Sequence, residues 1–316
     1  MKKRLIQLIA VIIALTFLGS LLWKYFDEIS NYHWKINYLY LSLSVILLFF
    51  MFLYGAWGWT IILHKLGVEI SYKKSMEIWV ASIIGKYIPG KVWTLLGRIY
   101  LGKKLGISRT KMSLAFILEI ALIVSSGIML FFFNFFFWRQ GEYISQVWPF
   151  LILFLSLSLI VMHPLVLQRI INTLLRLLKK EEVSINITYK DILLLLSFYV
   201  SFWFCYGISI FFLTKTFYPV TIASIPVITG IWAISVIVGI TVLIAPGGLG
   251  AREATTVFLL GFLIPAHIAL LVAISSRILL TILEIVFIGV LLNFDVSLSK
   301  YYKEIKLILP HQIDRL

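Results

Sequence analysis

Apolar runs of membrane-spanning length recur from one end of this chain to the other. A helix needs about 20 predominantly apolar residues to cross the hydrocarbon core of a bilayer. Several of the runs exceed that length, and short polar segments separate them. The sequence therefore predicts an all-α polytopic membrane protein, which narrows the possible architectures more than any other feature of the chain does.

The composition argues against a soluble enzyme. Hydrophobic residues make up 61% of the 316 residues and charged residues 13%, whereas a soluble domain carries about a quarter charged residues. No polar stretch is long enough to form a soluble catalytic domain. The formal net charge of +14 is explained by cationic cytoplasmic loops, so we expect no nucleic-acid partner. Hydropathy predicts about six full transmembrane helices, near residues 5–23, 39–63, 113–138, 147–163, 191–213 and 267–293.

Two further apolar segments, about 75–100 and 222–264, are interrupted by Pro-Gly motifs. The motifs are Tyr87-Ile-Pro-Gly-Lys91 and Ala245-Pro-Gly-Gly-Leu-Gly-Ala-Arg-Glu253, and about half of the chain separates them. Proline lacks a backbone N–H and glycine removes side-chain bulk, so both break a helix. Such breaks are tolerated at membrane depth only where protein buries them or where they line a wet cavity. Paired breaks in two halves of a membrane protein indicate a transporter-like binding site.

The distribution of lysine and arginine orients the chain in the membrane. Cytoplasmic loops carry an excess of these residues. Most of the cations lie near the two termini and in loops 64–74, 101–112 and 164–190, so both termini are predicted inside. Segment 75–100 has cationic loops on both sides. We therefore expect it to enter and leave from one face, as a re-entrant hairpin with its tip at Pro89-Gly90.

Segment 222–264 allows two arrangements. It forms either a second re-entrant hairpin, tipped at Pro246-Gly-Gly-Leu-Gly250, or two crossings, since both satisfy the parity of the topology. The hairpin is favoured because 251–264 is short for a span. Each half then contains two helices, a hairpin and a last helix, in opposite orientations. The prediction is one membrane domain over 1–316, built as an inverted repeat of 1–138 and 139–316.

Charged residues within the apolar segments mark a candidate binding site. An ionised side chain at the bilayer centre costs roughly 2.5–3.5 kcal/mol on insertion scales, so these residues must pair, face water or lie nearer the surface. A guanidinium is suited to forking onto a phosphate, and glycine-rich breaks present N–H groups and helix N-termini to anions. The candidate substrate-binding residues are the cations Lys91, Arg98, Arg252 and Arg277, the acids Glu119, Glu253 and Glu284, and the tip residues Pro89, Gly90, Pro246, Gly247, Gly248 and Gly250.

Structural roles compete with ligand binding for several of these residues. The position of Lys91 has an equally good explanation: its side chain would extend from the mouth of the re-entrant hairpin to the membrane surface. Arg277 and Glu284 are two turns of one helix apart, so an ion pair between them is an alternative to a role in binding. The five histidines lack ligand spacing, and Gly247-Gly-Leu-Gly250 lacks the Lys-Ser/Thr ending of a nucleotide-binding loop. We therefore predict no metal, no cofactor and no catalytic residue.

The motifs resemble those of a known family. The segments Gly85-Lys-Tyr-Ile-Pro-Gly-Lys-Val-Trp93 and Pro246-Gly-Gly-Leu-Gly-Ala-Arg-Glu-Ala254, with Glu119, Arg277 and Glu284, resemble the lysylphosphatidylglycerol synthase transmembrane (flippase-like) family over nearly the whole chain. The resemblance implies a membrane domain that moves aminoacylated anionic phospholipid between leaflets, with stand-alone relatives linked to polyprenyl-phosphate glycan pathways. Full-length synthases add a soluble aminoacyl-transferase domain. Because this sequence ends shortly after its last predicted helix, we expect no transfer of lysine from tRNA.

Residues and resemblance together favour a protein of the plasma (inner) membrane of a prokaryote that binds and translocates an anionic phospholipid or a polyprenyl-phosphate lipid. Arg98 and Arg252 would contact its phosphate. One alternative is a membrane-embedded transferase of a polyprenyl-phosphate glycan or cell-envelope pathway, with Glu119 or Glu253 as its acid or base. The other is a non-transporting scaffold for a separate lipid-modifying or glycosyltransferase enzyme.

Overall fold

The computed structural model describes residues 12, 16, 19–32, 35–88, 92–137, 144–177, 187–242 and 245–294. The regular structure of these residues is helical and includes no strand, which confirms the predicted all-α class. Among them are five helical segments long and apolar enough to span a membrane: Tyr38–Lys65, Arg109–Phe133, Tyr189–Phe217, Ile222–Thr241 and Ala266–Leu291. The chain is therefore a multi-pass membrane protein.

The helices follow the predicted apolar segments closely, except that the predicted crossing at 5–23 lies mostly outside the described residues. The elements are α2 (Phe26–Ser30), α3 (Tyr38–Lys65), α4 (Tyr72–Ser82), η1 (Ile83–Tyr87), α5 (Val92–Lys104), α6 (Arg109–Phe133), η2 (Asn134–Phe137), α7 (Ile144–Val161), α8 (Pro164–Leu177), α9 (Tyr189–Phe217), η4 (Ile222–Ser224), α10 (Ile225–Thr241), η5 (Pro246–Gly248), α11 (Ala251–Leu260) and α12 (Ala266–Phe294).

Polar capping residues set where the long helices begin. The Asn37 side chain accepts hydrogen bonds from the first backbone N–H groups of α3, and Ser108 does the same for α6. At the start of α9, Thr188 and Asp191 form a reciprocal capping box. These caps satisfy N–H groups that the helix itself leaves unpaired. They fall in the polar segments between apolar runs, which is why the helix boundaries follow hydropathy so closely.

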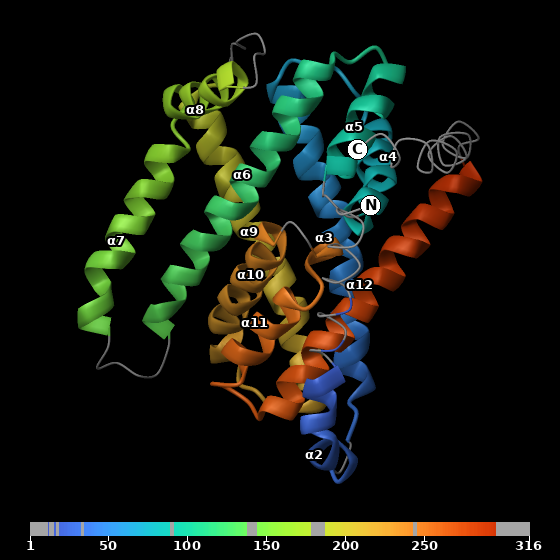
Figure 1. Cartoon of the computed structure of the whole chain (residues 1–316), viewed down its shortest axis with the longest axis vertical. Coiled ribbons are helices and arrows are strands. Elements are labelled where there is room, and N and C mark those ends of the chain that lie inside the picture. The colour runs from blue at the N-terminus through green and yellow to red at the C-terminus, as the bar shows by residue number, and fades with distance from the viewer. Residues whose placement is uncertain are drawn as a thin grey trace.

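Two broken helices face each other across the molecule. Figure 1 shows α4 and α5 side by side in the upper half and α10 and α11 side by side in the lower half, in agreement with their packing contacts. We call α4, η1 and α5 the first helical pair, and α10, η5 and α11 the second helical pair. The short turns η1 and η5 contact each other. The turn that leads into the first Pro-Gly motif and the turn of the second motif, distant in sequence, therefore meet in space.

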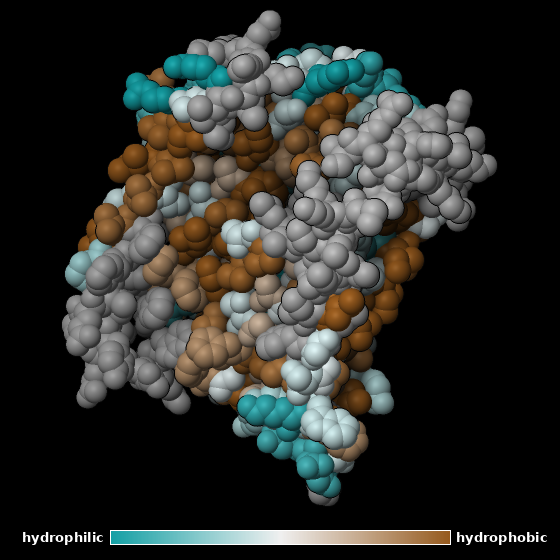
Figure 2. All heavy atoms as spheres, viewed as in Figure 1, coloured by the Kyte–Doolittle hydropathy of each residue, from teal (hydrophilic) through white to brown (hydrophobic). Residues whose placement is uncertain are grey.

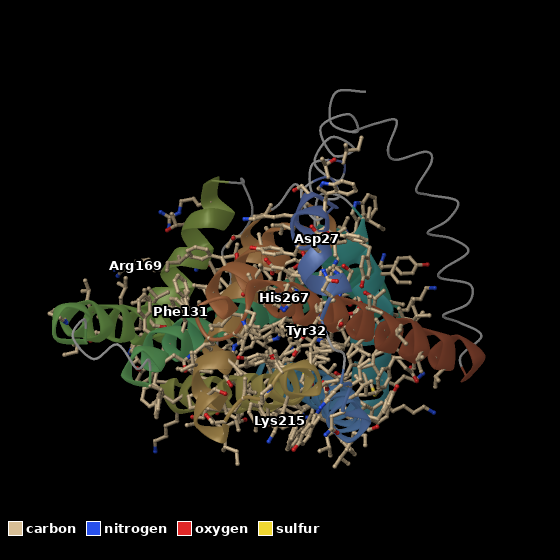
Figure 3. The ribbon with its side chains drawn as sticks, turned by 90° about the horizontal axis from the view of Figure 1, so that it is seen from below. Asp27, Tyr32, Phe131, Arg169, Lys215 and His267 are labelled. Atoms are coloured by element: carbon tan, nitrogen blue, oxygen red, sulfur yellow. The ribbon has the colours of Figure 1, made fainter. Side chains whose placement is uncertain are left out.

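The surface has an apolar middle between two polar ends. Figure 2 shows brown side chains over the middle of the molecule and teal ones at its upper and lower ends. At the lower end His267 Nδ1 lies 2.8 Å from Glu28 Oε2, and the Tyr32 hydroxyl donates to the carbonyl of Phe217 at 3.1 Å. Figure 3 shows Tyr32 and His267 close together at this end. These contacts hold α2 and the residues that follow it against α9 and α12.

Helix packing in the first half has a counterpart in the second half. The central contact joins α3 to α9. Around it, α3 packs on α4 as α9 packs on α10, and α5 packs on α6 as α11 packs on α12. Each helical pair also reaches the last helix of the other half, through contacts of α4 with α12 and of α10 with α6. Exchanging the two halves therefore leaves the pattern of helix contacts largely unchanged.

Glycines allow helices of the second half to approach closely. At Gly207 of α9, any Cβ would overlap both the side chain and the Cα of Thr229 on α10. Small residues at such crossings let backbones approach in membrane proteins, where van der Waals packing drives helix association.

We therefore expect Gly207→Ala to destabilise the protein by about 1–3 kcal/mol, the usual cost of an overpacked interior. Thermal unfolding of the purified protein in detergent, followed by gel filtration, measures the effect. Gly289→Ala is the matched control, because a Cβ at that exposed position of α12 meets nothing within 4 Å. Equal unfolding temperatures for the two variants would contradict this account of the α9–α10 contact.

Candidate functional site

A glycine lets the first helical pair turn at its tip. After α4 the chain tightens into η1, and Gly85 lies so close to α5 that a side chain there would overlap the backbone of Thr94. Only glycine fits this approach. It places Lys86 and Tyr87 at the end of η1, facing the other half of the molecule. The predicted tip residues Pro89, Gly90 and Lys91 lie outside the described residues.

Three glycines shape the turn of the second helical pair, which follows Pro246. Gly247, Gly248 and Gly250 have φ values of 57°, 72° and 83°, in a region that other L-residues adopt only at a cost. A Cβ at Gly248 would lie 2.6 Å from the backbone of Gly239 on α10. The glycines thus permit both the turn and its close packing, and they aim the N-terminus of α11 at the interior.

The start of α11 carries both an acid and a cation. The Gly250 N–H donates to Glu253 Oε2 at 2.7 Å, so Glu253 caps its own helix. The preceding residue, Arg252, places its guanidinium over the ring of Trp232, 4.8 Å from the ring centroid. The N-terminus of a helix presents N–H groups and a partial positive charge. This end of α11 therefore combines two features that attract anions.

Helix α12 joins the two tips. Arg277 Nη1 donates to the carbonyl of Gly247 at 2.8 Å, which binds α12 to η5. Two turns further along, Glu284 forms an ion pair with Lys86 and accepts a hydrogen bond from the Tyr87 hydroxyl at 2.8 Å, which binds α12 to η1. As their spacing predicts, Arg277 and Glu284 project from one face of the helix, but each pairs with a different tip.

A buried carboxylate balances two arginines. Glu253 Oε1 lies 3.7 Å from Arg277 Nη1 and 3.8 Å from Arg252 Nε, distances that permit charge attraction but exceed those of a hydrogen bond. The Glu253 side chain is 2% exposed and the Arg252 side chain 11% exposed. In this apolar surrounding the attraction is stronger than it would be in water.

Two polar atoms of this site have no hydrogen-bond partner among the described residues. Arg252 Nη2 and Glu253 Oε1 are both buried and neither makes a hydrogen bond. Leaving a buried donor or acceptor unsatisfied costs about 1–3 kcal/mol, and more for a charged group. Buried charged groups that keep unused hydrogen-bonding capacity at a helix N-terminus form a candidate position for a ligand.

We call the following residues the tip cluster: Lys86, Tyr87, Arg252, Glu253, Arg277 and Glu284. Its three cations face two carboxylates, which leaves one positive charge in excess. Among the described residues, no group of three or more His, Cys, Asp and Glu side chains is placed to hold a metal ion. The chemistry available at the tip cluster is therefore the binding of a negative group by charge and hydrogen bonds.

Arg98 and Glu119 form a separate pair. Arg98 Nη1 donates to Glu119 Oε2 at 2.5 Å and its Nε donates to Ser82 Oγ at 3.2 Å. The Trp79 indole donates to the other carboxylate oxygen at 2.8 Å. The guanidinium also lies 4.0 Å from the centroid of the Trp59 ring. Both charged residues are over 95% buried, so the two charges satisfy each other away from solvent.

The structure brings some of the predicted site residues together and sets others apart. Arg252, Glu253, Arg277 and Glu284 converge at the tips with Gly247, whereas no contact recorded for the described residues joins Arg98 or Glu119 to them. The predicted set did not include Lys86, Tyr87 and Trp232. Lys86 and Tyr87 stand three and two residues before Pro89 in sequence, and that position was the signal available for them.

Comparison with known protein families identifies the family of this chain. The sequence model of a family described as the lysylphosphatidylglycerol synthase TM region matches residues 7–289, which is nearly the whole chain. No curated protein matches the sequence significantly.

Proposed function

We propose that this chain, which belongs to the lysylphosphatidylglycerol synthase transmembrane family, binds an anionic lipid at the tip cluster and moves it between the leaflets of the membrane. The ligand is a phospholipid or a polyprenyl-phosphate lipid, since both carry the phosphate that the site would recognise. Its membrane would be the plasma (inner) membrane of a prokaryote, and a separate lipid-modifying or glycosyltransferase enzyme would supply or consume the lipid.

One observation carries this proposal. Arg252 Nη2 is buried without a partner, beside the N-terminus of α11 and within a cluster that has excess positive charge. A phosphate oxygen would complete the hydrogen bonding of the guanidinium, accept from the N–H groups of the helix end and neutralise the excess charge. Arg277 would approach the same phosphate from α12.

The arrangement of the helical pairs supports two re-entrant hairpins in an inverted repeat. In Figure 1 each pair lies in one half of the molecule, so each would enter and leave the membrane from one face. The segment η4–α10 is long enough to cross alone, but α11 returns beside it. The matched packing around α3 and α9 supports repeats over 1–138 and 139–316, and the cationic loops support an orientation with both termini inside.

Contact between η1 and η5 supports movement of the bound lipid. Irregular backbone is tolerated at membrane depth where it lines a cavity, and broken helices that meet near the midplane bind substrates in several transporters. Arg277 and Glu284 lie on one rigid helix, and each is bound to a different tip. Relative motion of the two helical pairs against α12 would expose the tip cluster to one leaflet and then to the other.

We expect Arg252→Gln to weaken lipid binding by about tenfold to a hundredfold, the value of a charge-assisted hydrogen bond. Native mass spectrometry of the purified protein identifies the retained lipid by mass and separates a phospholipid from a polyprenyl phosphate. Arg169→Gln is the control, since Arg169 is an exposed residue of α8. Gel filtration and thermal unfolding establish that both variants fold.

Equal retention of the same lipid by the wild type and Arg252→Gln would overturn the proposed site. Reconstitution into vesicles with a fluorescent form of the retained lipid then tests movement between leaflets. A protein that binds the lipid but leaves its leaflet distribution unchanged would be a scaffold rather than a transporter.

A further inference from the structure

Anion binding alone does not account for the Glu253 oxygen that lacks a hydrogen bond. Glu253 Oε2 is occupied by the Gly250 N–H, at 2.7 Å, while Oε1 is buried and accepts no hydrogen bond among the described residues. Oε1 is also the carboxylate oxygen recorded against both arginines, 3.7 Å from Arg277 Nη1 and 3.8 Å from Arg252 Nε. An anion that binds these guanidiniums must therefore lie close to Oε1.

Two cations face Glu253 directly, Arg277 from α12 and Arg252 from α11 itself. The other charged and titratable groups of the tip cluster, Glu284 of α12 and Lys86 and Tyr87 of η1, bind one another. Helix α10 contributes Trp232, which does not titrate and lies against the Arg252 guanidinium, and α9 contributes Tyr206, whose ring centroid lies 5.1 Å from that of Trp232. Glu284 already accepts from Lys86 and Tyr87. Of the two carboxylates, only Glu253 has an oxygen that accepts no hydrogen bond among the described residues.

An incoming phosphate would compete with Glu253 for Arg252 and Arg277. Two negative groups a few ångströms apart in an apolar site repel each other, and such pairs commonly retain one proton between them. A proton on Oε1 removes the repulsion and turns an unsatisfied acceptor into an O–H donor. That donor would form a charge-assisted hydrogen bond with a phosphate oxygen.

We propose that Glu253 takes up one proton from water when an anionic lipid binds at the tip cluster, so that the lipid and the proton are bound together. This inference rests on the proposed function. The proton moves from solvent to Oε1, no bond other than that O–H forms, and its positive charge offsets the charge of the headgroup. A gradient of protons across the membrane would then act directly on the occupancy of the lipid site.

Titration calorimetry of the detergent-solubilised full chain with short-chain phosphatidylglycerol tests the inference. The phosphodiester of this probe does not titrate near neutral pH, so any proton taken up belongs to the protein. The dependence of the observed heat on the ionisation enthalpy of the buffer gives the number of protons bound. We expect uptake of one proton per lipid, and an affinity that rises up to tenfold for each unit by which the pH falls.

Glu253→Gln identifies the residue, because an amide keeps an acceptor for Gly250 and supplies an N–H donor in place of the protonated oxygen. We expect it to bind the lipid with no proton uptake and with an affinity that does not change with pH. Glu69→Gln, at an exposed position outside the tip cluster, keeps the uptake.

The outcomes are distinguishable. Lipid binding by the wild type without proton uptake overturns this inference and leaves the proposed function standing, whether or not Glu253→Gln folds. Proton uptake that persists in a folded Glu253→Gln protein overturns the assignment to Glu253. Absence of lipid binding by the wild type overturns the inference together with the proposed function.

Discussion

Replacing Arg98 with alanine is expected to destabilise the protein by about 3–5 kcal/mol, the cost of breaking a buried ion pair by removing one partner. The Glu119 carboxylate, buried in the wild type, keeps only the Trp79 indole as a recorded partner, and Trp59 loses the guanidinium that lies over its ring. Thermal unfolding in detergent measures the loss. We expect a fall in the unfolding temperature larger than that of any other substitution discussed above.

The double variant Arg98→Met/Glu119→Gln separates the structural role of the pair from a role in binding. It removes both buried charges and keeps an acceptor for Trp79, so we expect it to recover most of the stability. If the pair is only structural, the double variant retains lipid. A stable double variant that loses lipid would instead restore Arg98 as a phosphate contact, as the sequence predicts.

Gly248→Ala is expected to disrupt the second tip. The residue has a φ of 72°, which costs an alanine roughly 1–2 kcal/mol, and its Cβ would lie 2.6 Å from the backbone of Gly239. A backbone atom cannot rotate away as a side chain can, so η5 must shift away from α10. This shift would separate the Gly247 carbonyl from Arg277. We expect a lower unfolding temperature and loss of lipid retention in native mass spectra.

Gly106→Ala is the matched control for this prediction. Gly106 has a similar φ of 77°, but a Cβ there meets nothing within 4 Å. It therefore incurs the same backbone strain without the overlap, and we expect its lipid retention to match that of the wild type. If Gly248→Ala behaved like Gly106→Ala, the close packing of η5 on α10 would have no role in forming the site.

Local sequence features predicted the parts of the site that lie on one helix or one turn. The spacing of Arg277 and Glu284 sets them on one face of α12 wherever that helix packs, because 3.6 residues complete a turn. The cap of α11 by Glu253 and the left-handed glycines of η5 are also local, but the sequence marked these residues only as candidates for binding and for the turn. Lys86 was missed because a cation beside a break has an equally good explanation as a residue at the membrane surface.

The sequence alone determined the membrane class, the helix boundaries, the two breaks and the identity of most charges near them. Each of these follows from hydropathy, capping or backbone preference within a few residues. Which charges meet depends on how helices far apart in sequence pack, so local sequence could not specify it. In the structure Arg98 forms an ion pair with Glu119 within the first half. Across the molecule, Lys86 pairs with Glu284 and Arg277 donates to the Gly247 carbonyl. The free energy of burying a charge makes pairing obligatory, but it does not specify the partner.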